Sequence, residues 1–216
     1  MKTTQIFGLH PVIEAIEAGR DIEKIYLKRD FGGELVKTLF AKIKTYGIPC
    51  RKVPVEKLNS FTEKNHQGAV AFVAEISYSN ISDIIPTFYE AGKTPLIVAL
   101  DGVTDIRNFG AISRTCECAG VDAILLPSYC SATINADAVK TSAGALHYLP
   151  VCRTDNLCQA IKFLKDSGFT VIALSEKANI AYTDQDYSSP TVLVLGAEDR
   201  GISSEVLNLC DSKVKI

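Results

Sequence analysis

The stretch LDGVTDIRNFGAISRTCECAG, residues 100–120, predicts the end of a buried strand followed by a turn and a helix. The apolar run LIVAL (96–100) has the length of a strand, Asp-Gly marks the turn, and a glycine ends the helical pattern. Asn108, Gly110 and Arg114 place an amide, a bare backbone and a guanidinium together at the beginning of that helix. This combination directly after a strand indicates contact with a ligand.

The chain around this stretch repeats the pattern of an apolar strand followed by a helix. Helical stretches separate most of five further apolar runs, which are AILLP (123–127), LPVC (149–152), VIAL (171–174), VLVL (192–195) and KVKI (213–216). Continuous apolar runs that alternate with helices predict a parallel sheet covered on both faces. We therefore expect an α/β domain over residues 95–216, with its ligand at the carboxyl ends of the strands.

Two other predicted strands also end in glycine or polar residues. Ser175 follows VIAL, and the sequence GAEDRG, which contains Glu198, follows VLVL. Tight turns explain most of the glycines, but they do not explain why Glu198 and Arg114 are expected at the same rim of the sheet. The common nucleotide motifs are absent, because no G-x-G-x-x-G follows a strand and no G-x-x-x-x-G-K-[ST] occurs. A G-x-S-x-G nucleophile turn is also absent, which disfavours an α/β-hydrolase.

The first third of the chain has the pattern of a smaller α/β domain. GLHPVIEAI predicts one helix, and a second is predicted from apolar residues at helical spacing between Leu35 and Tyr46. KIYL, CRKVP and GAVAFVAEI predict three strands. We expect a domain over 1–76, followed by a linker over 77–94 that contains Pro, Gly and one short helix.

Composition places the chain among ordinary globular proteins. It has 216 residues, of which 47% are hydrophobic and 22% charged. No apolar run approaches the roughly 20 residues that span a bilayer, and the N-terminus lacks the pattern of a signal peptide. We therefore expect an intracellular, cytoplasmic protein without a membrane segment.

Cysteine and histidine usage does not predict a disulfide framework or a metal site. The seven cysteines are odd in number and lack paired short spacings, which favours a reducing compartment. Cys116 and Cys118 would point about 200° apart on a helix. The three histidines are scattered without ligand spacing, so we expect no metal.

Three segments resemble the SpoU (TrmH-like) family of RNA ribose 2′-O-methyltransferases. DGVTDIRNFGAISRTCECAGV is similar to its first motif, N-x-G-x-x-x-R, and LVLGAEDRGIS to its second, G-x-E-x-x-G. NADAVKTSAGALHYLPV resembles the segment between them, and IFGLHPVIEAI and NHQGAVAFV resemble the small substrate-binding domain of the ribosomal-RNA guanosine enzymes in that family. The resemblance covers nearly the whole chain.

The resemblance implies a fold, a reaction and a set of residues. The implied fold is a small N-terminal α/β substrate-binding domain followed by a parallel-sheet domain of the trefoil-knotted SPOUT type. The implied reaction is 2′-O-methylation of a guanosine ribose in 23S ribosomal RNA with S-adenosyl-L-methionine, by a homodimer. The implied catalytic residues are Arg114, Asn108 and Glu198, and the implied cofactor-binding residues are Leu174, Ser175, Gly196 and Ile216.

Individual roles follow from the resemblance and from side-chain chemistry. Arg114 is expected to hold an RNA phosphate and to stabilise the developing alkoxide, because a guanidinium is a poor base. Glu198 is expected to hold Arg114 or Asn108 through charge-assisted hydrogen bonds. Gly110 and Gly196 are expected to let the backbone approach a ligand closely.

One departure from the family pattern keeps other interpretations open. In the family, a third motif that forms the knot and half of the cofactor pocket should follow KVKI. Two interpretations stay open: the protein lacks that segment, or the segment lies beyond Ile216. A transfer-RNA 2′-O-methyltransferase is one alternative. A non-catalytic RNA-binding or ribosome-assembly protein with the same fold is the other.

Charge is distributed unevenly between the two predicted parts of the chain. Residues 1–76 carry 12 Lys and Arg against 9 Asp and Glu, whereas residues 77–216 carry 11 against 16. The basic first half is therefore expected to bind RNA. The side chains expected to contact RNA there are Lys24, Lys28, Arg29, Arg51 and Lys52.

Overall fold

The computed structural model describes residues 5–30 and 32–216, which form two compact units. The first unit extends to Ser77 and includes Ile134–Ala136. The second unit comprises Tyr78–Thr133 and Asp137–Ile216. Each unit has a sheet and a hydrophobic core of its own.

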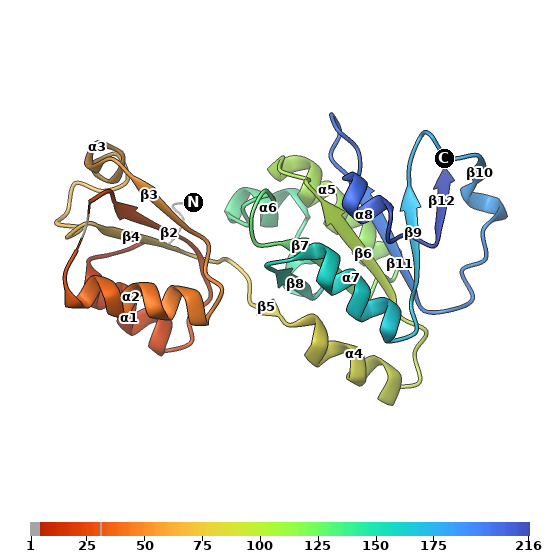
Figure 1. The fold of residues 1–216 in the computed structure, drawn as a ribbon, viewed down its shortest axis with the longest axis horizontal. Helices are drawn as coiled ribbons and strands as arrows, with labels where there is room; N and C mark the ends of the chain where they lie inside the picture. The colour runs from red at the N-terminus through yellow and green to blue at the C-terminus, as the bar shows by residue number, and fades with distance from the viewer. Residues whose placement is uncertain (1–4, 31) are drawn as a thin grey trace. The chain divides into compact units, whose positions relative to one another are not determined.

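The first unit is built on a mixed four-stranded sheet in the order β1-β4-β2-β3, seen on the left of Figure 1. Strand β2 is parallel to β3 and antiparallel to β4, which also pairs antiparallel with β1. The elements are β1 (Gln5–Phe7), α1 (Leu9–Glu17), β2 (Ile22–Lys28), α2 (Glu34–Thr45), β3 (Cys50–Val53), α3 (Val55–Asn59) and β4 (Ala69–Val73).

Helices α1 and α2 cover one face of this sheet because both carry an apolar stripe at helical spacing. Val12 and Ile16 of α1 and Leu39 of α2 are buried against Ile25 and Leu27 of β2. The opposite face is covered by α3 and the residues after it, and α3 has only 5 residues. That face is therefore less completely buried.

The second unit contains a parallel sheet of eight strands in the order β10-β12-β9-β11-β6-β7-β8-β5. Every strand pair of this sheet is parallel, which confirms the predicted architecture. The strands are β5 (Tyr78–Ser79), β6 (Leu96–Asp101), β7 (Ala123–Pro127), β8 (Val151–Thr154), β9 (Thr170–Leu174), β10 (Ile180–Ala181), β11 (Thr191–Gly196) and β12 (Ser212–Lys215).

The strand order reverses at β6, near the middle of this sheet. From β6 the chain adds β7 and β8 on one side, and β11 then fills the other side between β6 and β9. Figure 1 shows β6 and β11 running side by side. In open parallel sheets such a switch point leaves a crevice beyond the carboxyl ends of the two strands, where ligands bind.

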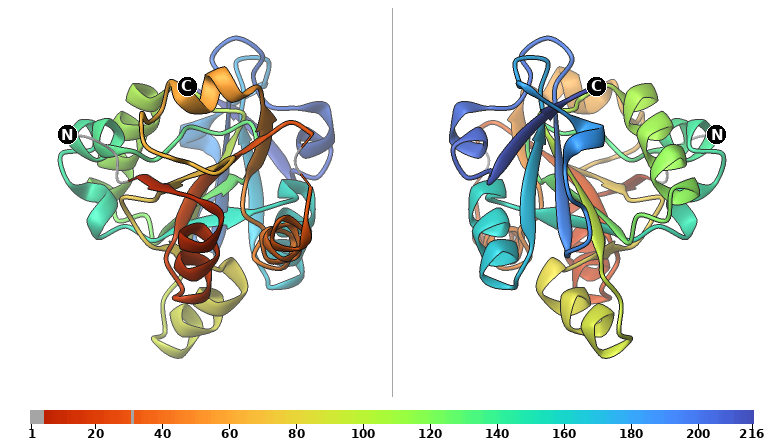
Figure 2. Two further views of the ribbon diagram at one scale, coloured as in Figure 1. Left: turned by 90° about the vertical axis from the view of Figure 1, so that its left-hand side faces the viewer. Right: turned by 90° about the vertical axis from the view of Figure 1, so that its right-hand side faces the viewer.

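Helices cover both faces of the larger sheet. The helices are α4 (Ile81–Glu90), α5 (Ile106–Cys118), α6 (Ala136–Thr141), α7 (Leu157–Asp166) and α8 (Ser204–Leu207), with short 3₁₀ turns at Ala145–His147 and Tyr182–Asp184. Residues of α4, α7 and α8 pack on one face around Val171 and Val192. Figure 2 shows α5, in green, across the strands from α7, in cyan.

The structure corrects the predicted linker over residues 77–94. Residues 78–79 form the edge strand β5, which pairs with β8, and residues 81–90 form α4. Ile81 and Ile85 of α4 are buried in the core of the second unit. These apolar side chains lie one turn apart on the helix, so the segment binds to the sheet instead of connecting two domains freely.

All six long strands predicted for the second unit are present. The short strands β1, β5 and β10 and the helix α3 were not predicted, because elements of two to five residues leave little periodicity to detect. Among the described residues, no helix is long and apolar enough to cross a bilayer.

All seven cysteines are free thiols, and they differ widely in burial. Burial raises the pKa of Cys152 to about 12 and that of Cys116 to about 11. Cys118 and Cys130 are exposed. We expect a thiol reagent at pH 8 to modify Cys118 and Cys130 first in the native protein, because the thiolate is the reactive form. Mass mapping after brief alkylation tests this, and early labelling of Cys152 would contradict it.

Candidate functional site

The carboxyl ends of β6 and β11 bring the two predicted motifs together. Asp101, the last residue of β6, is paired with Gly196, the last residue of β11. The chain therefore leaves both strands at the same edge of the sheet. The first motif continues into α5, and the second motif forms the loop after β11.

The beginning of α5 is held by its own capping residue. Asp105 lies in extended backbone before the helix, and its side chain accepts a hydrogen bond from the backbone N–H of Asn108 at 2.8 Å. An aspartate at this position satisfies one of the free N–H groups of the first turn. The cap fixes where Asn108 lies at the rim.

Asn108 and Glu198 are in direct contact. The side-chain Nδ2 of Asn108 donates a hydrogen bond to Oε2 of Glu198 at 3.1 Å, across 90 residues of sequence. A hydrogen bond to a carboxylate is stronger than one between neutral groups. Glu198 was expected to hold either Arg114 or Asn108, and in the structure its partner is Asn108.

The loop that carries Glu198 is closed on itself and tied to β6. Ala197 and Gly201 exchange two backbone hydrogen bonds of 3.1 and 2.8 Å. Oδ2 of Asp101 accepts a hydrogen bond from the backbone N–H of Ser203 at 2.7 Å. These bonds hold the loop at the end of β6 and so position Glu198.

Gly110 and Gly196 both allow close approach, but the groups that approach are parts of the same chain. A Cβ on Gly110 would lie 2.7 Å from Cβ of Thr141 and 3.0 Å from the carbonyl oxygen of Ala138, because α5 packs against α6. A Cβ on Gly196 would overlap the backbone of Gly201. Both glycines are therefore needed for packing within the second unit.

A cavity of about 420 Å³ lies between the two motifs. Its walls include Asn108, Glu198, Asp199 and Arg200. The Arg200–Asp199 ion pair has an N–O distance of 3.5 Å between exposed side chains, so it contributes little to stability. Carboxylate, amide and guanidinium groups thus converge on a space open to solvent.

Arg114 is not among the residues that line this cavity. It lies on α5 beyond Asn108, about 120° around the helix axis, and its side chain is exposed. Among residues 5–30 and 32–216, no hydrogen bond or ion pair involves the side chain of Arg114. The structure therefore joins Asn108 to Glu198 and leaves the guanidinium of Arg114 available to solvent.

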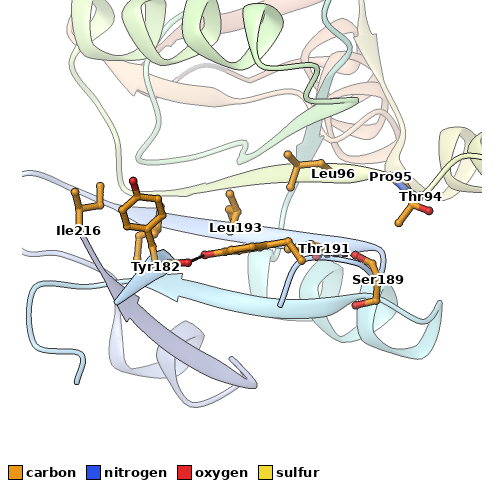
Figure 3. Close-up of a pocket in the computed structure, with 10 residues that line it drawn as sticks. Thr94, Pro95, Leu96, Tyr182, Ser189, Thr191, Leu193 and Ile216 are labelled. Carbon is orange, nitrogen blue, oxygen red and sulfur yellow. Dashed lines mark hydrogen bonds between the residues drawn. The ribbon is translucent and has the colours of Figure 1, made fainter. Parts of the chain in front are cut away.

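Two of the four predicted cofactor residues line a second, more apolar cavity (Figure 3). It has a volume of about 690 Å³, and its walls include Leu174, Leu193 and Ile216. Tyr182 and Tyr187 also face it, and the hydroxyl of Tyr187 donates a hydrogen bond of 2.9 Å to the carbonyl of Tyr182. Apolar and aromatic walls with a few polar groups are typical of sites for small organic molecules.

The other two predicted cofactor residues lie at the neighbouring strand ends, outside the walls of that cavity. Ser175 follows β9, and its backbone N–H donates to the carbonyl of Val214 in β12 at 2.9 Å. Gly196 ends β11 beside β9. The four residues are thus gathered at the carboxyl ends of three adjacent strands, but they do not share one cavity.

Comparison with known proteins identifies the family. The profile of the SpoU rRNA methylase family matches residues 95–216, and the profile for RNA 2′-O ribose methyltransferase substrate binding matches residues 5–79. This chain belongs to the SpoU rRNA methylase family. The match begins one residue before β6 and contains both motifs, which confirms the resemblance seen in the sequence.

Individual SpoU and TrmH relatives align over almost the whole chain. Proteins of Staphylococcus epidermidis and Staphylococcus aureus, described as TrmH-family tRNA/rRNA methyltransferases, are 31% and 32% identical over 100% of this chain and 87% of their own length. An AdoMet-bound rRNA methyltransferase from Sinorhizobium meliloti is 26% identical, with a TM-score of 0.59 over 99% of this chain and 78% of its own. The SpoU methyltransferase AviRb from Streptomyces viridochromogenes, at 21% identity and a TM-score of 0.59, has the same fold.

A third cavity, of about 660 Å³, is lined by two basic side chains that the sequence analysis did not predict as site residues. Arg107 of α5 and Lys140 of α6 both line it. Arg107 precedes Arg114 by two helical turns, so both arginines lie on one side of α5. That spacing was visible in the sequence, but no pattern connected Lys140 to the site.

The five basic residues predicted in the first unit do not share one surface. Lys24, Lys28 and Arg51 point to the α3 side of the sheet, because they are register partners of Phe72, Val53 and Tyr26. Lys52 points to the α2 side, with its ammonium 5.1 Å from the ring centre of Phe40. Arg29 follows the end of β2 and is exposed.

No group of three or more His, Cys, Asp or Glu side chains suited to a metal ion occurs in the described part of the chain.

Proposed function

We propose that this SpoU-family methyltransferase transfers a methyl group from S-adenosyl-L-methionine to a ribose 2′-hydroxyl of RNA, with a guanosine of 23S ribosomal RNA as its substrate. The observation that carries the proposal is the Asn108–Glu198 hydrogen bond. It joins the two family motifs at the switch point of the sheet, in the first turn of the helix that also carries Arg114.

The residues present fit S-adenosyl-L-methionine as the cofactor. Leu174, Leu193 and Ile216 supply apolar walls for an adenosyl group, and Ser175 and Gly196 supply polar backbone at the adjacent strand ends. When bound, the cofactor supplies an electrophilic methyl group on a positively charged sulfur. The AdoMet-bound relative from Sinorhizobium meliloti supports this assignment.

The guanidinium of Arg114 is the group suited to the RNA substrate. Guanidinium binds phosphate through paired N–H donors and remains charged when it does so. Held near the target ribose, this charge stabilises the oxyanion that forms as the 2′-hydroxyl loses its proton. Glu198 and Asn108 hold the rim against which the ribose is oriented.

Three observations support RNA, and ribosomal RNA in particular, as the substrate. The first unit matches the substrate-binding profile of RNA 2′-O ribose methyltransferases, and it is the basic half of the chain. The relative from Sinorhizobium meliloti is described as an rRNA methyltransferase. The homodimer and the cytoplasmic location implied by the family belong to the same proposal, and so does the knotted topology where the segment after KVKI is present.

Methyl transfer from radiolabelled S-adenosyl-L-methionine to purified RNA tests the proposal. We expect incorporation into 23S ribosomal RNA, and we expect the labelled dinucleotide to resist alkaline hydrolysis because its 2′-hydroxyl is blocked. Incorporation into transfer RNA alone would show that the substrate is transfer RNA and not 23S ribosomal RNA. RNA binding without any methyl transfer would favour the non-catalytic alternative.

The Asn108–Glu198 contact predicts a measurable loss of rate. We expect Asn108→Ala to lower methyl transfer about tenfold, because the lost hydrogen bond has a charged acceptor. Asn108→Asp should lower it further, because a second carboxylate would face Glu198. Both side chains are exposed, so the free energy of unfolding should change by less than about 0.5 kcal/mol. Rates equal to wild type in both variants would contradict the role of this contact.

A further inference from the structure

The first unit has a sheet face that is rich in aromatic rings and incompletely covered. Phe7, Tyr26 and Phe72 point away from α1 and α2, and Phe61, just after α3, packs against them. We call this surface, made of these four residues, the aromatic face. All four side chains are half-buried.

The other face of the same sheet has a larger buried core. Ile25, Leu27, Ala69 and Ala71 point toward α1 and α2, and each is 0% exposed. The five-residue α3 is too short to cover the aromatic face in the same way. The side of the sheet that carries the aromatic face does bury three aliphatic side chains, Val53, Leu58 and Val70, but the four rings around them remain half-buried.

The rings of the aromatic face form one cluster. The ring centres of Tyr26 and Phe61 are 4.8 Å apart, those of Phe61 and Phe72 are 5.2 Å apart, and those of Tyr26 and Phe72 are 5.7 Å apart. Two of the three pairs have edge-to-face geometry. Mutual packing of this kind holds ring orientations that would otherwise vary.

Positive side chains surround the cluster. The ammonium groups of Lys24, Lys57 and Lys64 lie 5.4, 5.1 and 5.3 Å from the ring centres of Tyr26, Phe61 and Phe7, respectively. The sheet register adds two more cations to this side, Lys28 and Arg51. Between Val55 and Lys64, the segment that carries Phe61, the acidic residues are Glu56 and Glu63. Cations therefore outnumber carboxylates around the rings.

We propose that the aromatic face binds unpaired nucleotides of the RNA substrate. Bases stack on the exposed parts of the rings, and the surrounding lysines contact the phosphates. Unpaired RNA is recognised by stacking on aromatic side chains within a positively charged surface. In a duplex the faces of the bases are stacked on one another, so a duplex would contact only the lysine and arginine side chains. The inference rests on the proposed RNA methyltransferase function and adds the surface and the RNA conformation to it.

Binding of the full chain to short RNA probes tests this inference without S-adenosyl-L-methionine. The probes are a fluorescein-labelled 12-nucleotide oligouridine and an unlabelled 12-base-pair RNA duplex, with anisotropy as the signal. We expect Tyr26→Leu and Phe61→Leu each to raise the Kd for oligouridine about tenfold. Leucine keeps an apolar side chain in the cluster and removes the stacking surface. The duplex should compete poorly.

The opposite face supplies a matched control. Lys52 and Phe40 form the same kind of pair on the α2 side, 5.1 Å apart. We expect Phe40→Leu to leave the Kd unchanged. Lys24→Ala should weaken binding and lower the slope of log Kd against log salt by about one. If a ring variant fails to fold, the double variant Lys24→Ala, Lys64→Ala tests the same surface, and we expect it to raise the Kd for oligouridine.

Three outcomes would overturn the inference: no binding of oligouridine by wild type, equal losses in Phe40→Leu and Tyr26→Leu, or duplex binding as tight as oligouridine binding. A protein partner would be indicated instead if the ring variants lost only association with other proteins. The proposed function fails separately, when oligouridine binds through the aromatic face but no RNA is methylated. The inference fails separately, when methylation proceeds and the ring variants bind like wild type.

Discussion

We expect Arg114→Ala to lower the rate of methyl transfer by about two to three orders of magnitude and to leave the melting temperature of the protein unchanged. The rate falls because the variant lacks the positive charge that holds an RNA phosphate and stabilises the forming oxyanion. Stability is retained because the Arg114 side chain is exposed and has no hydrogen bond or ion pair within the described residues. Single-turnover transfer from radiolabelled S-adenosyl-L-methionine measures the rate, and cofactor binding by calorimetry should be unaffected.

Two comparisons make this expectation specific. Arg114→Lys keeps the charge but loses the paired donors of guanidinium, so its rate should lie between those of alanine and wild type. Arg20→Ala removes an exposed arginine just after α1 and should leave the rate unchanged. A wild-type rate in Arg114→Ala would remove Arg114 from the proposed mechanism.

Gly196→Ala is expected to be the most destabilising small substitution at the site. The added Cβ would overlap the backbone of Gly201 and Ile202, which the closed loop holds against the end of β11. Backbone has no rotamer by which to move aside, so the loop must open. We expect a loss of about 3 kcal/mol in the free energy of unfolding of the second unit, at the upper end for overpacking. Urea denaturation followed by circular dichroism measures it.

The other glycines of the chain provide a graded control. Gly110→Ala should cost less, because its Cβ would lie 2.7 Å from Cβ of Thr141 and 3.0 Å from the carbonyl oxygen of Ala138, which is a milder overlap than the 2.1 Å approach to the backbone of Gly201 at Gly196. Gly32→Ala should be neutral, because nothing lies within 4 Å of its added Cβ. Opening of the loop would also carry Glu198 away from Asn108, so Gly196→Ala should lose activity as well. Equal stability of the Gly196 and Gly32 variants would show that the loop adapts at no cost.

The positions of the buried strands along the sequence of the second unit could be predicted, but their neighbours in the sheet could not. Runs such as LIVAL and VLVL lie on β6 and β11 because a strand buried on both faces needs an uninterrupted apolar sequence. Nothing in those runs indicates that β11 enters between β6 and β9. That placement depends on side-chain packing over the whole sheet, which local periodicity does not contain.

The linker error has a related cause. Residues 77–94 contain Pro86, Gly92 and several polar residues, which indicate a connection when counted by composition. Ile81 and Ile85 nevertheless share one face of α4, and burying them stabilises the helix on the sheet. The composition of a segment counts the residues on both faces of a helix together, whereas packing depends only on the face that contacts the sheet.

The sequence by itself determined the family of this protein, its parallel sheet and the residues Asn108, Arg114 and Glu198, because motifs and apolar runs are local patterns. Only the tertiary structure decided which of them touch: Asn108 contacts Glu198, Arg114 faces solvent, and Gly110 and Gly196 serve internal packing. It also collected the rings of the aromatic face from separate strands and a loop. Such contacts join residues distant in the chain, and their geometry is set by strand order and by where each strand ends.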